Sequence, residues 1–454
     1  MSPRVIPSDR AVRPRWLRTV TASASALVVS LAAAAAFPAD AAAIRSAAFP
    51  LGTAAIPSAA FPLGTAATPS GVWSGTEARR AQLQRLAREL VDAGAPGVVV
   101  RVDDGRDRPV EIAEQAPWTR RDHLLKVGDE FRMASNTKTM MATLVLLLVA
   151  EGKLALTDPV ERWLPGKVPN GEAITLRMLL NHTSGLFDYT EDATVRPSIL
   201  GADRRRWTSA ELLAVGVKHD PLFAPGAKWS YSNTNYVAIG AVLEQVTGVS
   251  LADLVRDRIA RPLGLKHTYY ATASTWRGSH AHGYEPDAAH MPPGVPAEYR
   301  RFAGAHRHGH VDVSDNDPSV GGAAGAVVST ARDWSRFYIA LMSGKLLPAA
   351  QLAQLRTTVP VDSRQPDGPG YGLGIQTGAG PCGTFWGHDG GMPGYLSTNL
   401  TDRTGSRTAT VLISAELWAE FEADPKIAKA AHALQTAVTC TMFGKPVPTA
   451  AHAG

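Results

Sequence analysis

Residues 131–150 read FRMASNTKTMMATLVLLLVA, and the architecture of the chain can be worked out from this segment. Its second half, Met140 to Ala150, is an apolar run, MMATLVLLLVA. That run is too short to span a membrane, which takes about 20 residues, but it suits a buried helix. Ser135 and Lys138 stand three residues apart at the start of the run, so one helical face would carry both side chains. The segment therefore predicts a core helix with a hydroxyl and a cation at its N-terminal end.

The pairing of a hydroxyl with a cation suggests nucleophilic catalysis. A serine hydroxyl attacks a carbonyl only when a base removes its proton, and a lysine can be that base when desolvation lowers its pKa. Backbone N–H groups at a helix N-terminus also favour developing negative charge. Against this, a serine near a helix start is often a simple N-cap. Because Ser135 and Lys138 form the sole Ser-x-x-Lys of the chain, the pair is a candidate that other motifs must support.

Two further motifs supply such support. Tyr231 and Asn233 form the sole Tyr-x-Asn, inside KWSYSNTNY. A tyrosine could shuttle a proton between nucleophile and leaving group, and an asparagine could donate to a substrate amide oxygen. His388 precedes Asp389, Gly390 and Gly391 in FWGHDGGMPGY, where flexible backbone would let an extended substrate lie along a strand. An ordinary loop tyrosine and a glycine-rich turn are the alternatives.

The three motifs, in this order, resemble those of the penicillin-recognising serine hydrolases, which include class C β-lactamases, D-alanyl-D-alanine carboxypeptidases, esterases and D-peptidases. The resemblance extends from about residue 80 to 443 and includes LLNHTSGLFDYT (179–190) and YGLGIQTGAGPCG (371–383). It is strongest to secreted serine-type D-Ala-D-Ala carboxypeptidases. It implies an α/β fold of the β-lactamase/transpeptidase type, in which helices flank a mainly antiparallel sheet and an all-helical domain is inserted.

The resemblance also implies roles for individual residues. Ser135 would be the acylated nucleophile, Lys138 and Tyr231 would share base and acid work, and His388 would support the leaving group electrostatically. The backbone N–H groups of Ser135 and Gly391 would form the oxyanion hole. Substrate would contact Asn233, Gly390, Gly391 and Gln376. No cofactor or metal is implied, and the partner would be a peptide or β-lactam.

Three positions depart from the carboxypeptidase pattern. Gln376 stands where an arginine would hold the substrate's terminal carboxylate, so that group would lose a bidentate partner. Val320 replaces a tryptophan of the pocket, and Gly391 replaces a hydroxyl residue. The acylation machinery is therefore expected to be intact while the specificity pocket is altered. We expect a D-Ala-D-Ala carboxypeptidase, with a β-lactamase, an esterase or a D-amino-acid peptidase as alternatives.

Other classes of function remain to be weighed. His306, His308, His310 and Asp312 resemble alternating metal ligands, as a metal-dependent hydrolase would need. Nearby prolines and glycines instead predict a loop, solvated or covering the cleft, with no strand to aim those ligands. A non-catalytic penicillin-binding sensor is the other alternative, and the intact Ser135, Lys138 and Tyr231 argue against it.

The ends of the chain predict export. Residues 1–43 combine arginines, an apolar stretch and small residues, as a signal peptide does, and residues 44–75 hold a duplicated SAAFPLGTAA that suggests a linker. Of the net charge of +5, the first 43 residues carry +3, so no nucleic-acid partner is expected. In a secreted chain Cys382 and Cys440 favour one disulfide over two free thiols. We expect a monomer without a membrane span.

The remaining pattern divides the hydrolase, expected at residues 76–445 before a tail at 446–454, into sheet and helices. Helices are predicted near 76–94 and 425–443, and a strand at 97–104. Residues from about 157 to 300 would form the helical subdomain. Further strands are expected at 325–330, 371–377, 394–401 and 407–414. This order predicts one sheet assembled from both ends of the chain.

Overall fold

The computed structural model describes residues 75–291, 302–416 and 425–448. The predicted signal peptide, nearly all of the linker and the last six residues of the tail lie outside these ranges.

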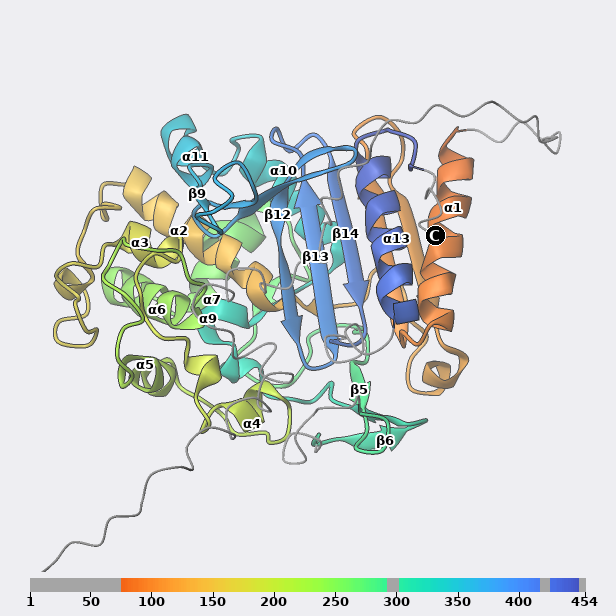
Figure 1. Ribbon diagram of the computed structural model, residues 1–454, viewed down its shortest axis with the longest axis horizontal. Coiled ribbons are helices and arrows are strands. Elements are labelled where there is room, and N and C mark those ends of the chain that lie inside the picture. Colours follow the sequence, from red (N-terminus) through yellow and green to blue (C-terminus); the bar gives the residue numbers. More distant parts are fainter. Residues whose placement is uncertain (1–74, 292–301, 417–424, 449–454) are drawn as a thin grey trace, which may run out of the picture.

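The centre of the protein is an eight-stranded sheet in which all neighbouring strands are antiparallel (Figure 1). Strands from the two ends of the chain are neighbours in it, because β1 pairs with β14 from Val98–Ile413 to Asp103–Thr408. The predicted assembly of one sheet from both chain ends is therefore confirmed. In sheet order the strands are β2 (Val110–Gln115), β1 (Gly97–Asp103), β14 (Thr408–Ile413), β13 (Tyr395–Thr401), β12 (Gly383–Met392), β11 (Gln376–Gly380), β10 (Gly370–Tyr371) and β9 (Val359–Pro360).

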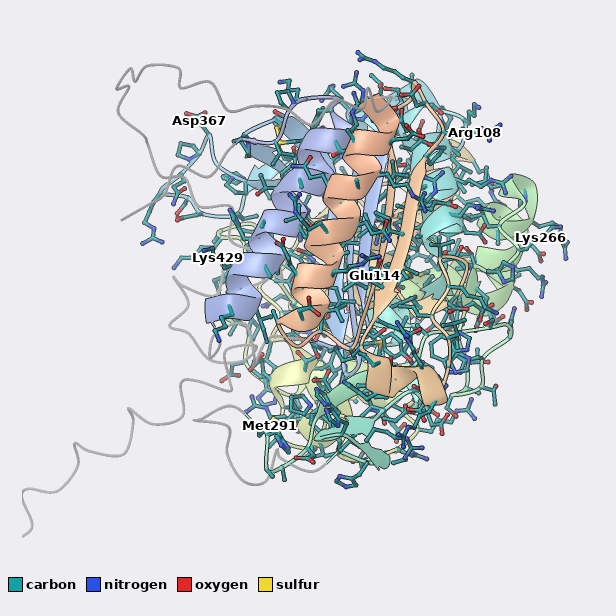
Figure 2. All side chains as sticks on the ribbon, turned by 90° about the vertical axis from the view of Figure 1, so that its right-hand side faces the viewer. Arg108, Glu114, Lys266, Met291, Asp367 and Lys429 are labelled. Atoms are coloured by element: carbon teal, nitrogen blue, oxygen red, sulfur yellow. A yellow bond between two sulfur atoms is a disulfide. The ribbon has the colours of Figure 1, made fainter. Side chains whose placement is uncertain are left out.

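Helices cover both faces of this sheet. On the outer face, α1 (Gly75–Asp92) and α13 (Pro425–Met442) run side by side (Figure 2). The buried leucines of α1, at positions 83, 86 and 90, follow helical spacing and face the sheet. The opposite face packs against α10 (Ala331–Met342), an amphipathic helix that contacts β1, β13 and β14. β1 is buried on both sides, which explains its unbroken valine run.

The middle of the chain is mainly helical, as the sequence predicts. Within the described ranges, no single helix has the length and apolar composition needed to cross a membrane. The pair Asn233–Thr247 and Leu251–Leu263 reaches that length and composition only when taken together, and the two helices are bent by 84°. The elements are α3 (Leu176–Leu180), α4 (Arg196–Ile199), α5 (Ser209–Val217), α6 (Asn233–Thr247), α7 (Leu251–Val255), a π-helical turn (Arg256–Ala260), α8 (Arg261–Leu263), α9 (Gly322–Gly325) and α11 (Ala349–Leu355).

The apolar run forms α2 (Thr137–Ala150), which is buried almost throughout its length. It packs between α6, α9 and α11 within the larger hydrophobic core. Eleven of its residues are buried, including Lys138, whose side chain is fully covered. The expectation of a core helix is confirmed, and α2 holds its first turn at the junction of sheet and helical region.

Two expected strands differ from the prediction. Residues 371–377 do not form one strand, because Gly372–Ile375 turn between β10 and β11. Gly374 has a φ of 70°, which an extended strand does not have and which glycine adopts most easily. A Cβ atom at this position would lie 2.7 Å from the Lys138 carbonyl oxygen, so the chain passes too close to α2 for a side chain here. The strand expected at 325–330 is β8 (Val327–Ser329), in a separate sheet between β3 (Phe131–Arg132) and β4 (Tyr269–Tyr270).

The histidine-rich segment is a strand hairpin and not the loop that its prolines and glycines suggested. β6 (Ala305–Arg307) pairs with β7 (His310–Asp312), which pairs with β5 (Tyr284–Pro286). Trp118 stacks on His308 and His310, with ring centroids 5.7 and 4.9 Å apart, and this packing compensates for the weak strand pattern. No group of three or more His, Cys, Asp or Glu residues in the described ranges is arranged to hold a metal ion.

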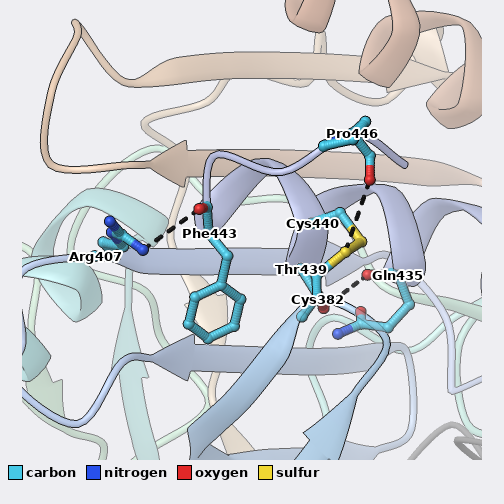
Figure 3. Close-up of a disulfide and its surroundings, with 7 residues drawn as sticks. All are labelled: Cys382, Arg407, Gln435, Thr439, Cys440, Phe443 and Pro446. Atoms are coloured by element: carbon cyan, nitrogen blue, oxygen red, sulfur yellow. Dashed lines mark hydrogen bonds between the residues drawn. A yellow bond between two sulfur atoms is a disulfide. The ribbon is translucent and has the colours of Figure 1, made fainter. Parts of the chain in front are cut away.

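The predicted disulfide is present (Figure 3). Cys382 and Cys440 are bonded, with Cα atoms 5.0 Å apart and a separation of 58 positions in sequence. The bond joins the turn between β11 and β12 to the last turns of α13. It therefore ties α13 to β11 and β12, and β12 contains His388 and Gly390.

Candidate active site

Ser135 and Lys138 meet as their spacing predicts. Ser135 lies in a 3-10 turn, η4 (Ala134–Asn136), that leads directly into α2. The Lys138 ammonium group donates to Ser135 Oγ over 3.0 Å, to Asn233 Oδ1 over 2.7 Å and to the Ala324 carbonyl over 3.0 Å. Three fixed acceptors therefore hold the amine against the hydroxyl.

The surroundings of Lys138 make it a base at neutral pH. Burial lowers its pKa from 10.5 to about 7, against the opposing charges of Asp188 and Asp389. A large fraction of the lysine is then neutral near pH 7 and can take the serine proton. The desolvation that the apolar helix suggested is observed, and its source is the packing around α2 and the helical region together.

Tyr231 lies on the other side of this amine. The Lys138 nitrogen is 4.8 Å from the centre of the Tyr231 ring, and the tyrosine hydroxyl is buried. Burial raises the Tyr231 pKa well above its ordinary value, while interaction with Ser135 lowers it. Among the described residues, none makes a hydrogen bond of good geometry with that hydroxyl. A neutral phenol beside Ser135 can pass a proton to the leaving group.

Asn233 is held in one orientation from both ends of its amide. Its Oδ1 accepts from Lys138, and its Nδ2 donates to Asp188 Oδ2 over 2.9 Å. One N–H of the amide is left for a substrate oxygen. Asp188 also accepts from the backbone N–H and the hydroxyl of Thr190. Burial raises the Asp188 pKa, and the hydrogen bonds and Lys138 oppose that rise.

Strand β12 approaches the nucleophile because Gly390 has no side chain. A Cβ atom there would lie 2.4 Å from the Met133 carbonyl oxygen and 2.7 Å from the Ser135 backbone nitrogen. On the opposite side, Ala134 has a φ of +45°, which non-glycine residues seldom adopt and which often marks functional sites. Ser135, Gly390 and Gly391 all line one cavity. This is where the oxyanion hole is expected.

His388 lies beneath the cavity and does not line it. Its side chain is 2% exposed, and Nε2 lies 2.9 Å from the Tyr371 hydroxyl, while Nδ1 lies 2.6 Å from the Asp389 carbonyl oxygen. Burial and the nearby Lys138 lower the His388 pKa to about 3. The ring is therefore neutral at physiological pH.

Gln376 also stands back from the cavity. It starts β11 and hydrogen-bonds the side chain of Asp389, which does line the cavity. Burial raises the Asp389 pKa well above its ordinary value, and the bond from Gln376 and the charge of Lys138 act against it. Where a carboxylate-binding arginine was expected, the site presents an acid and an amide.

The cavity at Ser135 measures about 190 Å³ and has an acidic lining. Asp188, Asp317, Asp389 and Glu416 contribute to its wall. The cation in the described part of the wall is Arg132, which is 3% exposed and donates to the carbonyls at positions 314 and 316. Val320 also lines the wall.

The structure brings together most of the residues that the motifs indicated. Ser135, Lys138, Tyr231 and Asn233 share one hydrogen-bonded or ring-contact cluster, with Gly390 and Gly391 opposite. The motifs did not identify Asp188, Asp389, His182 and Tyr371. These four residues lie inside the segments LLNHTSGLFDYT, FWGHDGGMPGY and YGLGIQTGAGPCG, which could have drawn attention to them. Their spacing along the chain did not indicate a chemical role.

Comparison with known proteins gives the family of the chain. The beta-lactamase family model matches residues 83–434. Penicillin-binding protein 4* of Bacillus subtilis (strain 168) is 29% identical over 347 residues, which cover 74% of this chain and 68% of that protein.

Solved structures with the same fold include two hydrolases of D-amino-acid compounds. The D-stereospecific amidohydrolase from Streptomyces sp. is 37% identical, with a TM-score of 0.66, and the match covers 78% of this chain and 98% of that one. The D-amino acid amidase from Ochrobactrum anthropi SV3 complexed with D-phenylalanine is 26% identical, with a TM-score of 0.68, over 80% and 99% of the two chains.

Proposed function

Because the chain belongs to the beta-lactamase family, within the penicillin-recognising serine hydrolases, we propose that it hydrolyses amides of D-amino acids through an acyl-enzyme on Ser135. The observation that carries the proposal is the acidic cavity beside Ser135, whose described lining offers carboxylates and no exposed guanidinium to a substrate. An amide with a free amino group suits such a wall, whereas a terminal carboxylate does not.

Acylation follows from the contacts of Ser135. Neutral Lys138 takes the hydroxyl proton over the 3.0 Å hydrogen bond, and Oγ attacks the substrate carbonyl carbon. The oxyanion forms near the backbone N–H groups of Ser135 and Gly391. Tyr231 passes a proton to the leaving nitrogen as the C–N bond breaks. Water then attacks the ester by the same groups in reverse, releasing the acid and restoring Ser135.

Asp188 is suited to the substrate's ammonium group. It lies at the cavity wall beside Asn233, and its two oxygens accept three hydrogen bonds from Thr190 and Asn233. A carboxylate has about four acceptor positions, so one remains on the oxygen that Asn233 contacts. Burial makes the lone charge costly, and an arriving ammonium would offset that cost.

Asp389 and Gln376 act on the leaving-group side. Asp389 directly precedes Gly390 on β12 and lines the cavity, and Gln376 lies on the neighbouring strand β11, where it pairs with Gly387. A leaving group with a free carboxylate would meet a buried acid and an amide at this place and, among the described residues there, no guanidinium, so its charge would lack a bidentate partner. An uncharged leaving group such as ammonia or a short amine avoids this.

D-Ala-D-Ala carboxypeptidase activity is the second candidate. It is favoured by the disulfide of Cys382 and Cys440, since a cysteine pair at this place is part of the resemblance to secreted carboxypeptidases. β-Lactamase and esterase activities share the acylation step and remain alternatives. Export of the protein and a monomeric state are also parts of this proposal. The segment expected to be a signal peptide lies outside the described residues.

A substrate panel tests the proposal. Mass spectrometry would follow D-phenylalanine amide, L-phenylalanine amide, N-acetyl-D-phenylalanine amide, a D-Ala-D-Ala peptide, a cephalosporin and a short ester. We expect D-phenylalanine amide to be cleaved fastest and its N-acetylated form at least about tenfold more slowly. Release of D-alanine from the peptide at a higher kcat/KM would favour the carboxypeptidase.

The acyl-enzyme itself has a separate test. A fluorescent penicillin should label the protein covalently, and Ser135→Ala should abolish the label. The same substitution should lower kcat by on the order of 10⁴ or more, as for other nucleophiles that act as a unit with their base. A label retained by Ser135→Ala would refute the assignment of the nucleophile.

A further inference from the structure

Below the cavity, a continuous line of hydrogen bonds joins two motifs of the active site. The Ser232 backbone N–H and the Asn235 side-chain nitrogen lie 3.2 and 3.1 Å from His182 Nδ1. His182 Nε2 lies 3.2 Å from the Tyr371 hydroxyl, which lies 2.9 Å from His388 Nε2. His388 Nδ1 lies 2.6 Å from the Asp389 carbonyl oxygen. His182, Tyr371 and His388 are each at most 2% exposed.

The backbone atoms at the two ends fix where each proton sits. A backbone N–H can only donate, so His182 Nδ1 is an acceptor and the neutral ring carries its proton on Nε2. A backbone carbonyl can only accept, so His388 carries its proton on Nδ1. Tyr371 then accepts from His182 and donates to His388 Nε2. Every hydrogen bond in the line is satisfied with both rings neutral.

We propose that His182 and Tyr371 are positioning residues for acyl transfer, and that His388 joins them as a neutral ring in its Nδ1–H form. The line starts at Ser232, next to Tyr231, and ends at Asp389, next to Gly390. It therefore fixes the tyrosine segment relative to the strand of the expected oxyanion hole, across two elements 157 residues apart in sequence. This role replaces the electrostatic support expected of His388.

The charges around the line require neutral rings. The centre of the Tyr231 ring lies 4.8 Å from Lys138 Nζ and 4.3 Å from the centre of the His182 ring. A cation on His182 would therefore stand near the Lys138 amine and oppose its charge. The groups facing the two histidines are Lys138, Asp389, Tyr231, Tyr236 and Tyr371. Burial and Lys138 lower the pKa of both histidines.

Histidine NMR on the wild-type protein tests the assignment without any substrate. With ¹⁵N-labelled histidine, the His388 signals should show the Nδ1–H form and those of His182 the Nε2–H form. Neither ring should titrate between pH 5.5 and 8.5. Signals are assigned by their loss in His388→Gln and His182→Gln. An Nε2–H form of His388, or a midpoint for it near 6, would overturn the proposal whatever the natural substrate.

Kinetics of Tyr371→Phe test the positioning role, which rests on the proposed acyl-enzyme function. We expect kcat for D-phenylalanine amide to fall about 10- to 100-fold with KM changed less than about threefold, because small misplacement of catalytic groups costs rates of this order. The NMR spectrum of the variant should show a shifted His388 Nε2 signal, because the Tyr371 donor is gone, while the Asp389 carbonyl keeps the ring in its Nδ1–H form.

A matched control separates positioning from lost stability. Tyr284→Phe removes another buried hydroxyl, which donates to Asp122 over 3.0 Å and does not line the cavity. It should leave kcat within about twofold. If Tyr371→Phe keeps the wild-type kcat and an unchanged His388 signal, the proposal fails. If the wild type lacks amidase activity but the tautomers are as assigned, the proposed substrate is wrong and the line of hydrogen bonds stands.

Discussion

Replacing Asp188 by asparagine should shift the pH profile of the enzyme without abolishing catalysis. Lys138 must be neutral to accept the Ser135 proton, and its pKa is about 7. The wild-type kcat/KM should therefore rise with pH through about 7. By simple titration the neutral fraction at pH 6 is about 9% of that on the plateau, so the rate there should be roughly tenfold lower.

The size of the shift follows from the separation of the charges. Asp188 and Lys138 are bridged by the Asn233 amide through hydrogen bonds of 2.9 and 2.7 Å. For unit charges on the order of 7 Å apart at an effective dielectric of about 20, Coulomb's law gives roughly 2 kcal/mol, or between one and two pKa units. Asp188 raises the pKa of Lys138, so its removal moves the acidic limb to lower pH. At pH 6 the variant should then reach at least about half of its own plateau.

The assay should use p-nitrophenyl acetate, which has no titrating group of its own and no ammonium for Asp188 to bind. Asparagine keeps an oxygen that can accept from Asn233, while its amide nitrogen replaces the oxygen that accepts from Thr190, so the orientation of Asn233 should persist at the cost of the Thr190 bonds. Asp192→Asn is the matched control, since Asp192 lies in the same segment but pairs with Lys218 and His219. A limb that stays in place or moves to higher pH in Asp188→Asn would refute the electrostatic reasoning.

Three other changes have defined outcomes. Lys138→Met should raise the free energy of unfolding at neutral and lower pH. Between pH 7 and 10.5 the unfolded lysine binds a proton that the folded one lacks, so below pH 7 the wild-type protein is less stable by about 4–5 kcal/mol than it is at pH 10.5. Chemical denaturation at pH 6.5 should therefore show the variant to be more stable than the wild type, and this difference should vanish at pH 10.5. Replacing Cys382 and Cys440 by serine should cost up to about 4 kcal/mol in the same experiment, and an unchanged urea midpoint would show that the bond constrains little. Val320→Trp should fill the cavity and lower kcat/KM for D-phenylalanine amide at least about tenfold more than for D-alanine amide, and equal losses would place Val320 away from the substrate side chain.

Much of the fold could be predicted from local pattern. The apolar run after Lys138 and the leucine spacing of α1 determined two helices, because burial periodicity is a property of the sequence itself. Two predictions failed where tertiary contacts overrode that pattern. The turn at Gly374 exists because the chain passes α2, and the hairpin of His306 and His310 is held by Trp118.

The candidate site shows the same division. The order of the motifs indicated Ser135, Lys138, Tyr231 and Asn233, since each brings a side chain whose chemistry is needed for acyl transfer. The sequence also shows a glutamine at position 376, where the carboxypeptidase pattern has a carboxylate-binding arginine. It could not reveal that Asp188 orients Asn233, because that contact joins a loop to the start of α6, 45 residues further along the chain.

What the sequence determined by itself is the set of reactive groups and the helix that carries the first two of them. Only the tertiary structure decided their protonation: Lys138 has a pKa of about 7 because neighbouring helices remove water from it, and His388 is neutral because it is buried beside Lys138. The acidic character of the cavity is likewise tertiary, since Asp188, Asp389 and Asp317 come from separate segments. Desolvation and electric field depend on what surrounds a group in space, and spacing along the chain does not record it.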